Sequence, residues 1–265
     1  MNKVQLITLA GAFFLFIGLY WGTGTKPKER KSVEKSRTLV AESVDIDELL
    51  RDAKKELSAE LGSEVALVES KYAASNSDTA KATVLKNLAH IWYDQHRIEL
   101  SGHYAQKVAE IEGTEKAWFI AAATFREAAQ KAANDKMRQF CSTRSLRAYE
   151  STLSLNPTSV VNKLNLAVCY ADNPPADNPM KGILMLRELN EQAPENVAVI
   201  NTLGRLAIKT GQFDKAVARL EKAISLEPNN QTSICLLAEA YENSNETAKA
   251  AEFAKKCKTS IDKTK

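Results

Sequence analysis

Glycine, proline and aromatic residues are scarce in this chain of 265 residues, which has 10 Gly, 7 Pro and 7% aromatic side chains. Glycine and proline build turns, so their scarcity disfavours a fold of many short strands. Runs rich in Ala, Leu, Lys and Glu occupy the space between them and favour an all-α chain. The net charge of +3 is too small to indicate a nucleic-acid-binding protein by itself.

The sequence also lacks the short motifs of common catalytic sites. None of the patterns GxSxG, HExxH, GxGxxG or the phosphate-binding loop occurs. The only histidines are His90, His96 and His103, and the last two stand two turns apart on a helix, about 10 Å, too far to share one ion. We therefore predict that the chain is no enzyme and has no catalytic residue, cofactor or metal site.

Cysteine is sparse too, and the four residues, Cys141, Cys169, Cys235 and Cys257, show no CxxC spacing. Without nearby histidine partners they do not predict a zinc site. Cys169, Cys235 and Cys257 fall in apolar helical stretches, where cysteine commonly acts as a small buried hydrophobe. We predict reduced thiols, which favours a reducing compartment.

One long apolar run, residues 4–21, has no charged residue and would extend about 27 Å as a helix, close to the thickness of a bilayer core. We predict a transmembrane anchor at residues 1–24, in contact with lipid through residues 4–21, and a basic flexible tether at residues 25–44. The tether carries the cations after the span, namely Lys26, Lys28, Arg30, Lys31, Lys35 and Arg37. The positive-inside rule then predicts a cytoplasmic C-terminal part. A cleaved signal peptide is the alternative.

The stretch from Val197 to Pro228 has the clearest pattern in the chain. Its apolar and small residues recur at helical spacing on two successive segments, Ile200, Leu203, Gly204 and Ala207 on the first and Ala216, Leu220 and Ala223 on the second. Small residues at three of these positions allow two helices to approach closely, while Leu203 and Leu220 fill the remaining space. Gly211 suits the end of the first helix, and Pro228 prevents continuation of the second.

This spacing resembles the tetratricopeptide repeat (TPR), a 34-residue helix–turn–helix unit. One such hairpin cannot bury its own apolar face, so neighbouring hairpins must stack on it. We therefore predict an all-α, TPR-type right-handed solenoid over residues 76–265, on which a helical segment at residues 45–75 packs. The predicted units are residues 80–113, 115–157, 158–196, 197–230 and 231–265.

The outer units show the same spacing less regularly. The first has Leu85, Leu88, Ala89 and Trp92, then Ala105 and Ala109 after a link that is several residues too long; the second has Trp118, Ala121, Ala122 and Phe125; the third has Val161, Leu164, Asn165 and Val168; the last has Leu237 and Tyr241. An insertion of about five residues at Asp172–Pro179 separates the two helices of the third unit. Insertions in solenoids often lie on the binding face, although a tolerated loop explains this one equally well.

The resemblance implies a function in protein binding, because TPRs bind peptides in a concave groove lined by their first helices. The corresponding polar positions are Asn162, Asn201, Arg205, Lys209, Thr232 and Glu239. The anchor, tether and repeats together resemble membrane-anchored TPR proteins of Gram-negative bacteria. We therefore predict a single-pass scaffold at the bacterial inner membrane that binds a protein or peptide, with no nucleic-acid partner. A periplasmic chaperone or assembly factor and a regulatory subunit of an enzyme are the alternatives.

Overall fold

The computed structural model describes residues 44–261 of the chain, and it describes their side chains as far as residue 258. The described part consists of helices without a strand: α3 (Ile46–Lys55), α4 (Ala59–Ala74), α5 (Asp78–Asp94), α6 (Ile98–Glu112), α7 (Glu115–Lys131), α8 (Asp135–Leu155), α9 (Val160–Asp172), α10 (Lys181–Gln192), α11 (Val197–Lys209), α12 (Phe213–Leu226), α13 (Gln231–Asn243) and α14 (Thr247–Ile261). None of these helices is both long and apolar enough to cross a membrane. The predicted anchor, and the tether before residue 44, lie outside the described residues.

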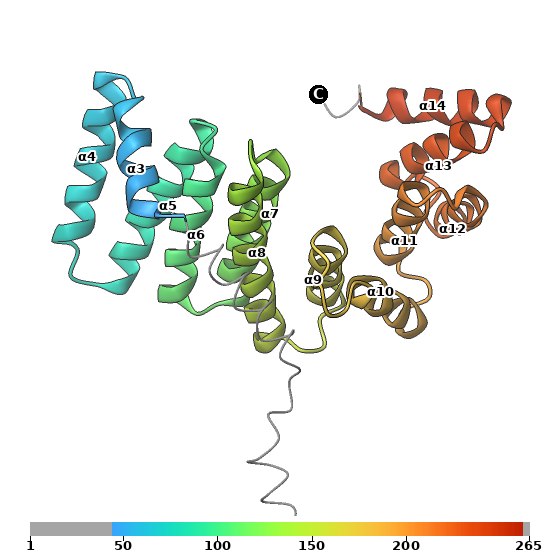
Figure 1. The fold of residues 1–265 in the computed structure, drawn as a ribbon, viewed down its shortest axis with the longest axis horizontal. Helices are drawn as coiled ribbons and strands as arrows, with labels where there is room; N and C mark the ends of the chain where they lie inside the picture. Colours follow the sequence, from blue (N-terminus) through green and yellow to red (C-terminus); the bar gives the residue numbers. More distant parts are fainter. Residues whose placement is uncertain (1–43, 262–265) are drawn as a thin grey trace, which may run out of the picture.

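The helices form a stack in which, from α4 to α14, each packs on the next in chain order (Figure 1). Helices α3 to α8 lie at one end and α11 to α14 at the other, with α9 and α10 between them. The direction of the helices turns along the stack, so that the axis of α14, at one end, is roughly perpendicular to those of α4 and α5, at the other (Figure 1). The described chain is therefore an all-helical solenoid of hairpins of the TPR type.

The helical segment predicted at residues 45–75 forms two helices, α3 and α4. Asp45 caps α3 by accepting hydrogen bonds from the backbone N–H groups of Asp47 and Glu48. The chain then leaves the helix at residues 56–58, and Ser58 caps α4 by accepting from Leu61 N–H. An N-cap at Ser58 starts a new helix there. Ala53 of α3 and Val65 of α4 are buried against the neighbouring hairpin, so the pair closes the end of the core.

Three of the hairpins have a turn of the same conformation between their two helices. This turn corrects the predicted register of the first unit. The turns pass through His96, Gly211 and Asn245, whose φ angles are 59°, 71° and 63°. In each turn the next N–H donates to a carbonyl five residues earlier, from Arg97 to Trp92 at 2.9 Å and from Gln212 to Ala207 at 2.8 Å. The link between α5 and α6 is therefore no longer than the link between α11 and α12. The prediction was wrong because the extra residues extend the helices.

The third predicted unit is also shifted, by two residues on its first helix. Helix α9 begins after its cap Ser159, as α11 begins after its cap Asn196, and this places Leu166, Ala167 and Tyr170 where α11 has Leu203, Gly204 and Ala207. These three residues are buried, whereas Val161 is 55% exposed and Leu164 is half-buried. The predicted stripe through Val161, Leu164, Asn165 and Val168 followed apolar spacing alone and missed the cap.

The close approach predicted for the hairpin of α11 and α12 depends on Gly204. A Cβ atom on Gly204 would lie 2.8 Å from two atoms of the Leu220 side chain. The other predicted packing residues differ in burial. Those that are fully or nearly buried are Ala216, Leu220, Ala223, Leu237, Leu203 and Tyr241. Trp118 is half-buried against the core, and Pro228 is exposed after the end of α12. The two helices thus touch where Gly204 of α11 faces the Leu220 side chain of α12.

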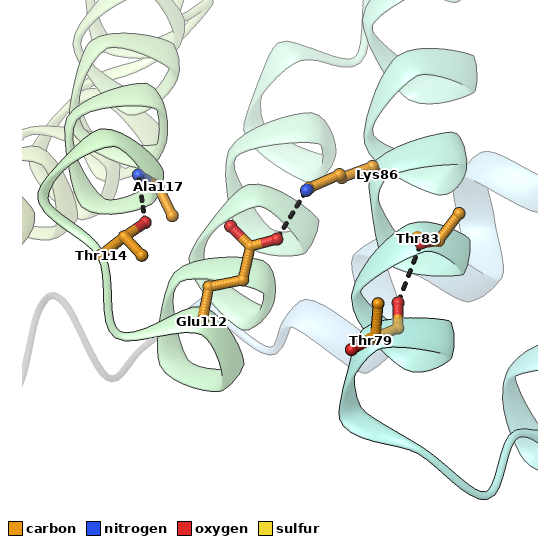
Figure 2. Close-up of polar contacts among 6 residues, drawn as sticks. All are labelled: Thr79, Thr83, Lys86, Glu112, Thr114 and Ala117. Atoms are coloured by element: carbon orange, nitrogen blue, oxygen red, sulfur yellow. Dashed lines mark hydrogen bonds and ion pairs between the residues drawn. The ribbon is translucent and has the colours of Figure 1, made fainter.

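Polar contacts join and cap helices of the N-terminal hairpins (Figure 2). Lys86 on α5 forms an ion pair with Glu112 at the end of α6, with Nζ and Oε1 2.5 Å apart. Thr114 caps α7 by accepting a hydrogen bond from Ala117 N–H at 3.2 Å. The ion pair is largely exposed and contributes little stability, whereas the cap fixes where α7 begins.

A disulfide bond joins Cys235 of α13 to Cys257 of α14, with the two Cα atoms 5.0 Å apart. The prediction of reduced thiols was wrong for this pair. Apolar surroundings indicated burial but could not reveal that two residues 22 positions apart meet across the last hairpin. Cys141 and Cys169 are free and buried. Burial raises the pKa of the Cys169 thiol to about 11, so at neutral pH this side chain is an unreactive neutral group.

Candidate functional site

A hollow of about 690 Å³ lies along the first helices of successive hairpins. We call it the α11 groove. Its walls come from α11 and α13, from Leu164 of α9, and from the turns before α11 and α13. The lining residues are Leu164, Glu195, Asn196, Val197, Ala198, Asn201, Thr202, Arg205, Glu227, Asn230, Thr232 and Leu236. Apolar side chains such as Leu164 and Leu236 alternate here with charged and amide groups, a combination that suits a polypeptide.

Caps and turns shape the lip of this groove. Asn196 caps α11 by accepting from Val199 N–H at 3.1 Å, and Asn230 caps α13 by accepting from Ser233 N–H at 3.0 Å. A glutamate precedes each cap and lines the groove, Glu195 before Asn196 and Glu227 before Asn230. The groove therefore has carboxylates on the side of the helix starts, while Arg205 supplies a cation further along α11.

Asn201 lines the groove but is only 5% exposed, and its polar atoms have partners within the protein. Its Nδ2 donates to Asn230 Oδ1 at 3.3 Å, and its Oδ1 accepts from Ser233 Oγ at 2.9 Å. Asn201 therefore holds α13 against α11. A partner would contact its outer edge without taking over these hydrogen bonds.

Asn162 does not belong to the groove, because it is 1% exposed and lies deep between α7, α8 and α9. Its Nδ2 donates to Glu115 Oε1 at 2.7 Å and to the Thr152 carbonyl at 3.3 Å. The prediction that Asn162 precedes Asn201 on the binding face was wrong. The two-residue shift on α9 explains the error, since Leu164 occupies the position equivalent to Asn201.

The other predicted binding residues are exposed, but only some of them lie together. Arg205 and Thr232 line the α11 groove. Lys209 lines a smaller hollow of about 170 Å³ between α9 and α11, which we call the α9–α11 hollow. Glu239, one turn beyond Leu236 on α13, lines neither. The structure thus brings Asn201, Arg205, Lys209 and Thr232 to adjoining surfaces and leaves Glu239 apart.

Sequence reasoning missed a third hollow, about 230 Å³, between α7, α8 and α9. We call it the Arg126 pocket; its lining comprises Arg126, Ala129, Gln130, Arg138, Ser142, Ser145, Cys169, Asp172 and Asn173. Arg126 Nε is buried and has no hydrogen-bond partner among the described residues, with Asp172 Oδ2 3.9 Å away. The available signal was Arg126 itself, a cation inside the small-residue run from Ala121 to Ala129.

The three hollows adjoin one another. Thr202 and Arg205 line both the α11 groove and the α9–α11 hollow, and Gln130 and Asp172 line both that hollow and the Arg126 pocket. A path lined by shared residues thus leads from α13 across α11 and α9 to α7. Asp172 and Asn173, where the predicted insertion begins, lie at its far end. Across the residues whose side chains the structure describes, no group of three His, Cys, Asp or Glu could hold a metal ion.

These features define a helical-repeat protein whose distinctive surface is a groove. The family model described as tetratricopeptide repeat matches residues 181–230 and 207–256. The matched residues run from α10 into α14, less than half of the chain, and over them the sequence is similar to tetratricopeptide repeats. The matched residues supply most of the α11 groove.

Solved structures give the same picture of the fold. A tetratricopeptide repeat protein from Parabacteroides merdae is similar at a TM-score of 0.55 and 14% identity, covering 88% of this chain and 80% of that chain. A MamA protein from Desulfovibrio magneticus also matches, at a TM-score of 0.45 and 14% identity over 69% of this chain and 96% of that one, too low a score for a conclusion. No curated protein matches the chain. At this identity the first likeness shows a shared fold and no function.

Proposed function

We propose that the protein is a non-enzymatic adaptor that binds a segment of a partner protein in the α11 groove. The observation that carries the proposal is the groove itself, about 690 Å³ along the first helices of the hairpins that match the family. Its mixed lining supports the proposal, because peptide grooves use a few apolar anchors with polar groups that set direction. The packed helices around it offer a preformed surface, which lowers the entropy lost on binding.

Photocrosslinking in the native membrane tests this function. A photoreactive residue at Thr232 or Ala198, both exposed in the groove, should capture one protein partner. The same residue at Arg187, exposed on α10 and outside the three hollows, is the matched control. The additional change Arg205→Glu should remove the groove crosslink and leave the melting temperature unchanged. Equal capture from the groove and from α10 would contradict the proposal.

The proposal includes a membrane anchor at residues 4–21 and a single-pass location at a bacterial inner membrane. Two observations disagree on the side of the membrane. The basic residues after the apolar run favour a cytoplasmic solenoid, whereas the Cys235–Cys257 disulfide favours an oxidising compartment such as the periplasm. We give the disulfide more weight, because charges near a span set orientation only statistically and an exported chain would explain the bond.

A periplasmic chaperone or assembly factor is therefore the second candidate, and the disulfide is the observation that favours it. Fusion of the full chain to alkaline phosphatase or to a fluorescent protein at its C-terminus separates the two locations. Phosphatase activity with a dark fluorescent fusion is the result expected for a periplasmic solenoid. The reverse result, with the cysteine pair reduced in cells, would place the adaptor in the cytoplasm. Extraction of the chain by salt alone would contradict the anchor.

A further inference from the structure

The Arg126 pocket contains a cation whose hydrogen bonds are incomplete. Its Nε–H is buried without an acceptor among the described residues, its Nη1 donates to Asn165 Oδ1 at the long distance of 3.5 Å, and the guanidinium group also contacts the Tyr149 hydroxyl. Leaving a buried donor unpaired is unfavourable, and the guanidinium group normally binds a carboxylate through two parallel hydrogen bonds. Arg126 is thus arranged to accept an anionic partner that the protein itself does not supply.

Asp172 is the nearest carboxylate, and it satisfies Arg126 poorly. Its Oδ2 lies 3.9 Å from Nε, beyond hydrogen-bond length, and its side chain is 43% exposed. Arg138, also in the lining, already pairs with Asp135 outside the pocket. The pocket of about 230 Å³ is large enough for a short acidic side chain beside Arg126.

The position of the pocket indicates where such a carboxylate comes from. The pocket shares Gln130 and Asp172 with the α9–α11 hollow, which shares Thr202 and Arg205 with the α11 groove. We propose that the Arg126 pocket receives a glutamate or aspartate side chain of the partner segment that lies in the groove. This inference rests on the proposed function and adds a specificity site at the α7 end of the path that leads from the groove.

The probe for this site is blocked glutamate, N-acetylglutamate N-methylamide, with the glutamine analogue as its uncharged match. Ligand-observed NMR on the full chain in detergent should show at least a tenfold preference for the glutamate form. Arg126→Gln should abolish the preference. Arg144→Gln, a half-buried arginine on α8 outside all three hollows, should retain it. If Arg126→Gln is unstable, Arg126→Lys takes its place in the test. This variant keeps the charge and should retain part of the preference.

A second variant gives a change of opposite sign. Asp172→Asn removes the competing carboxylate and should tighten glutamate binding several-fold, which a purely structural role of Arg126 would not cause. Absence of glutamate binding, or a preference that survives Arg126→Gln or disappears in Arg205→Gln, would overturn the inference. These outcomes leave the proposed function standing if groove crosslinks persist. Conversely, a glutamate preference without groove crosslinks would overturn only the proposal that the partner binds in the groove.

Discussion

The hairpins from α5 to α8 and those from α11 to α14 solve the same packing problem with different side chains. In the first pair the interior is filled by large groups, namely Trp92, Phe125, Phe140 and Tyr149, all almost fully buried. In the second pair the corresponding space holds Leu220, Leu237 and one aromatic residue, Tyr241, together with small residues such as Ala216 and Ala240. Helices α5, α7 and α8 have 17 to 21 residues, whereas α11, α12 and α13 have 13 or 14. Longer helices around aromatic side chains give larger interfaces and lose the regular repeat.

The difference also appears in how the cores are connected. One cluster of buried residues runs from Ala53 of α3 to Tyr170 of α9, and a second cluster around Phe125 and Phe140 lies in the same half. The residues buried between α11 and α14 form a separate cluster around Leu220 and Leu237, and a small cluster at Leu186 and Leu203 joins the two regions. The N-terminal half should therefore unfold as one unit, while the C-terminal hairpins open more independently.

Removing the largest buried side chain gives the strongest test of this division. Trp92→Ala should lower the free energy of unfolding by about 3–5 kcal/mol, because it leaves a cavity between α5 and its neighbours. Hydrogen exchange should speed up from α3 to α8 and much less in α11 to α14. Leu220→Ala is the matched change in the other half, with about 2–5 kcal/mol lost there. Uniform loss of protection over both halves would show that the solenoid is a single cooperative unit.

The disulfide tests the independence of the last hairpin. Helix α14 packs on α13, and the bond between Cys235 and Cys257 closes a loop across them. Replacing both cysteines by serine should cost about 2–4 kcal/mol, mostly as opening of α14. Reductant should give the wild type the same loss and leave the double variant unaffected. If reductant changes neither protein, the bond does not contribute to stability.

The contribution of histidine to acid sensitivity should come from the N-terminal half, since all three histidines lie there. Burial lowers the pKa of His103 to about 4, with Lys107 and Arg144 adding repulsion and Asp47 opposing the shift. The folded pKa lies below the ordinary value of 6.5, so the unfolded chain binds the proton more tightly. Stability is complete above pH 6.5 and falls by about 1–3 kcal/mol towards pH 4.

The variant His103→Gln isolates this contribution from the carboxylates that titrate in the same range. The free energy of unfolding of the variant is compared with that of the wild type at each pH. Between pH 6.5 and pH 4 the variant should lose less stability than the wild type, by the contribution of His103. Exchange rates in α5 to α8 should respond first. Identical pH profiles for the two proteins would mean that His103 is protonated in the folded state as readily as in the unfolded chain.

The sequence was most informative where small residues specify close contact. Gly204, Ala216 and Ala223 predicted the hairpin of α11 and α12, and Gly211 predicted its turn, because few other residues fit those positions. The register failed on α5–α6 and α9, where caps and turns determine it and apolar spacing allows several solutions. Asn162 was misplaced for that reason. The disulfide and the Arg126 pocket join residues distant in the chain, and periodicity contains no information about such pairs.

The shared turn offers the finest comparison between the halves, because the same left-handed residue is histidine in one and glycine in the other. His96 adopts φ 59° and Gly211 adopts φ 71°. A side chain strains this conformation, and glycine does not. Gly211→Ala should therefore destabilise the protein by about 1 kcal/mol, although a Cβ there would meet no atom within 4 Å.

The reciprocal change, His96→Gly, should stabilise the protein by a few tenths of a kcal/mol, since relief of strain is offset by the greater freedom of glycine in the unfolded chain. Both shifts are measured from the midpoint of urea unfolding, with the slope unchanged. His90→Gly in the second half of α5 is the control, and it should destabilise by about 0.5 kcal/mol. A loss of stability in His96→Gly would mean that the imidazole contributes more to the turn than its backbone conformation costs, and that the two turns are alike only in shape.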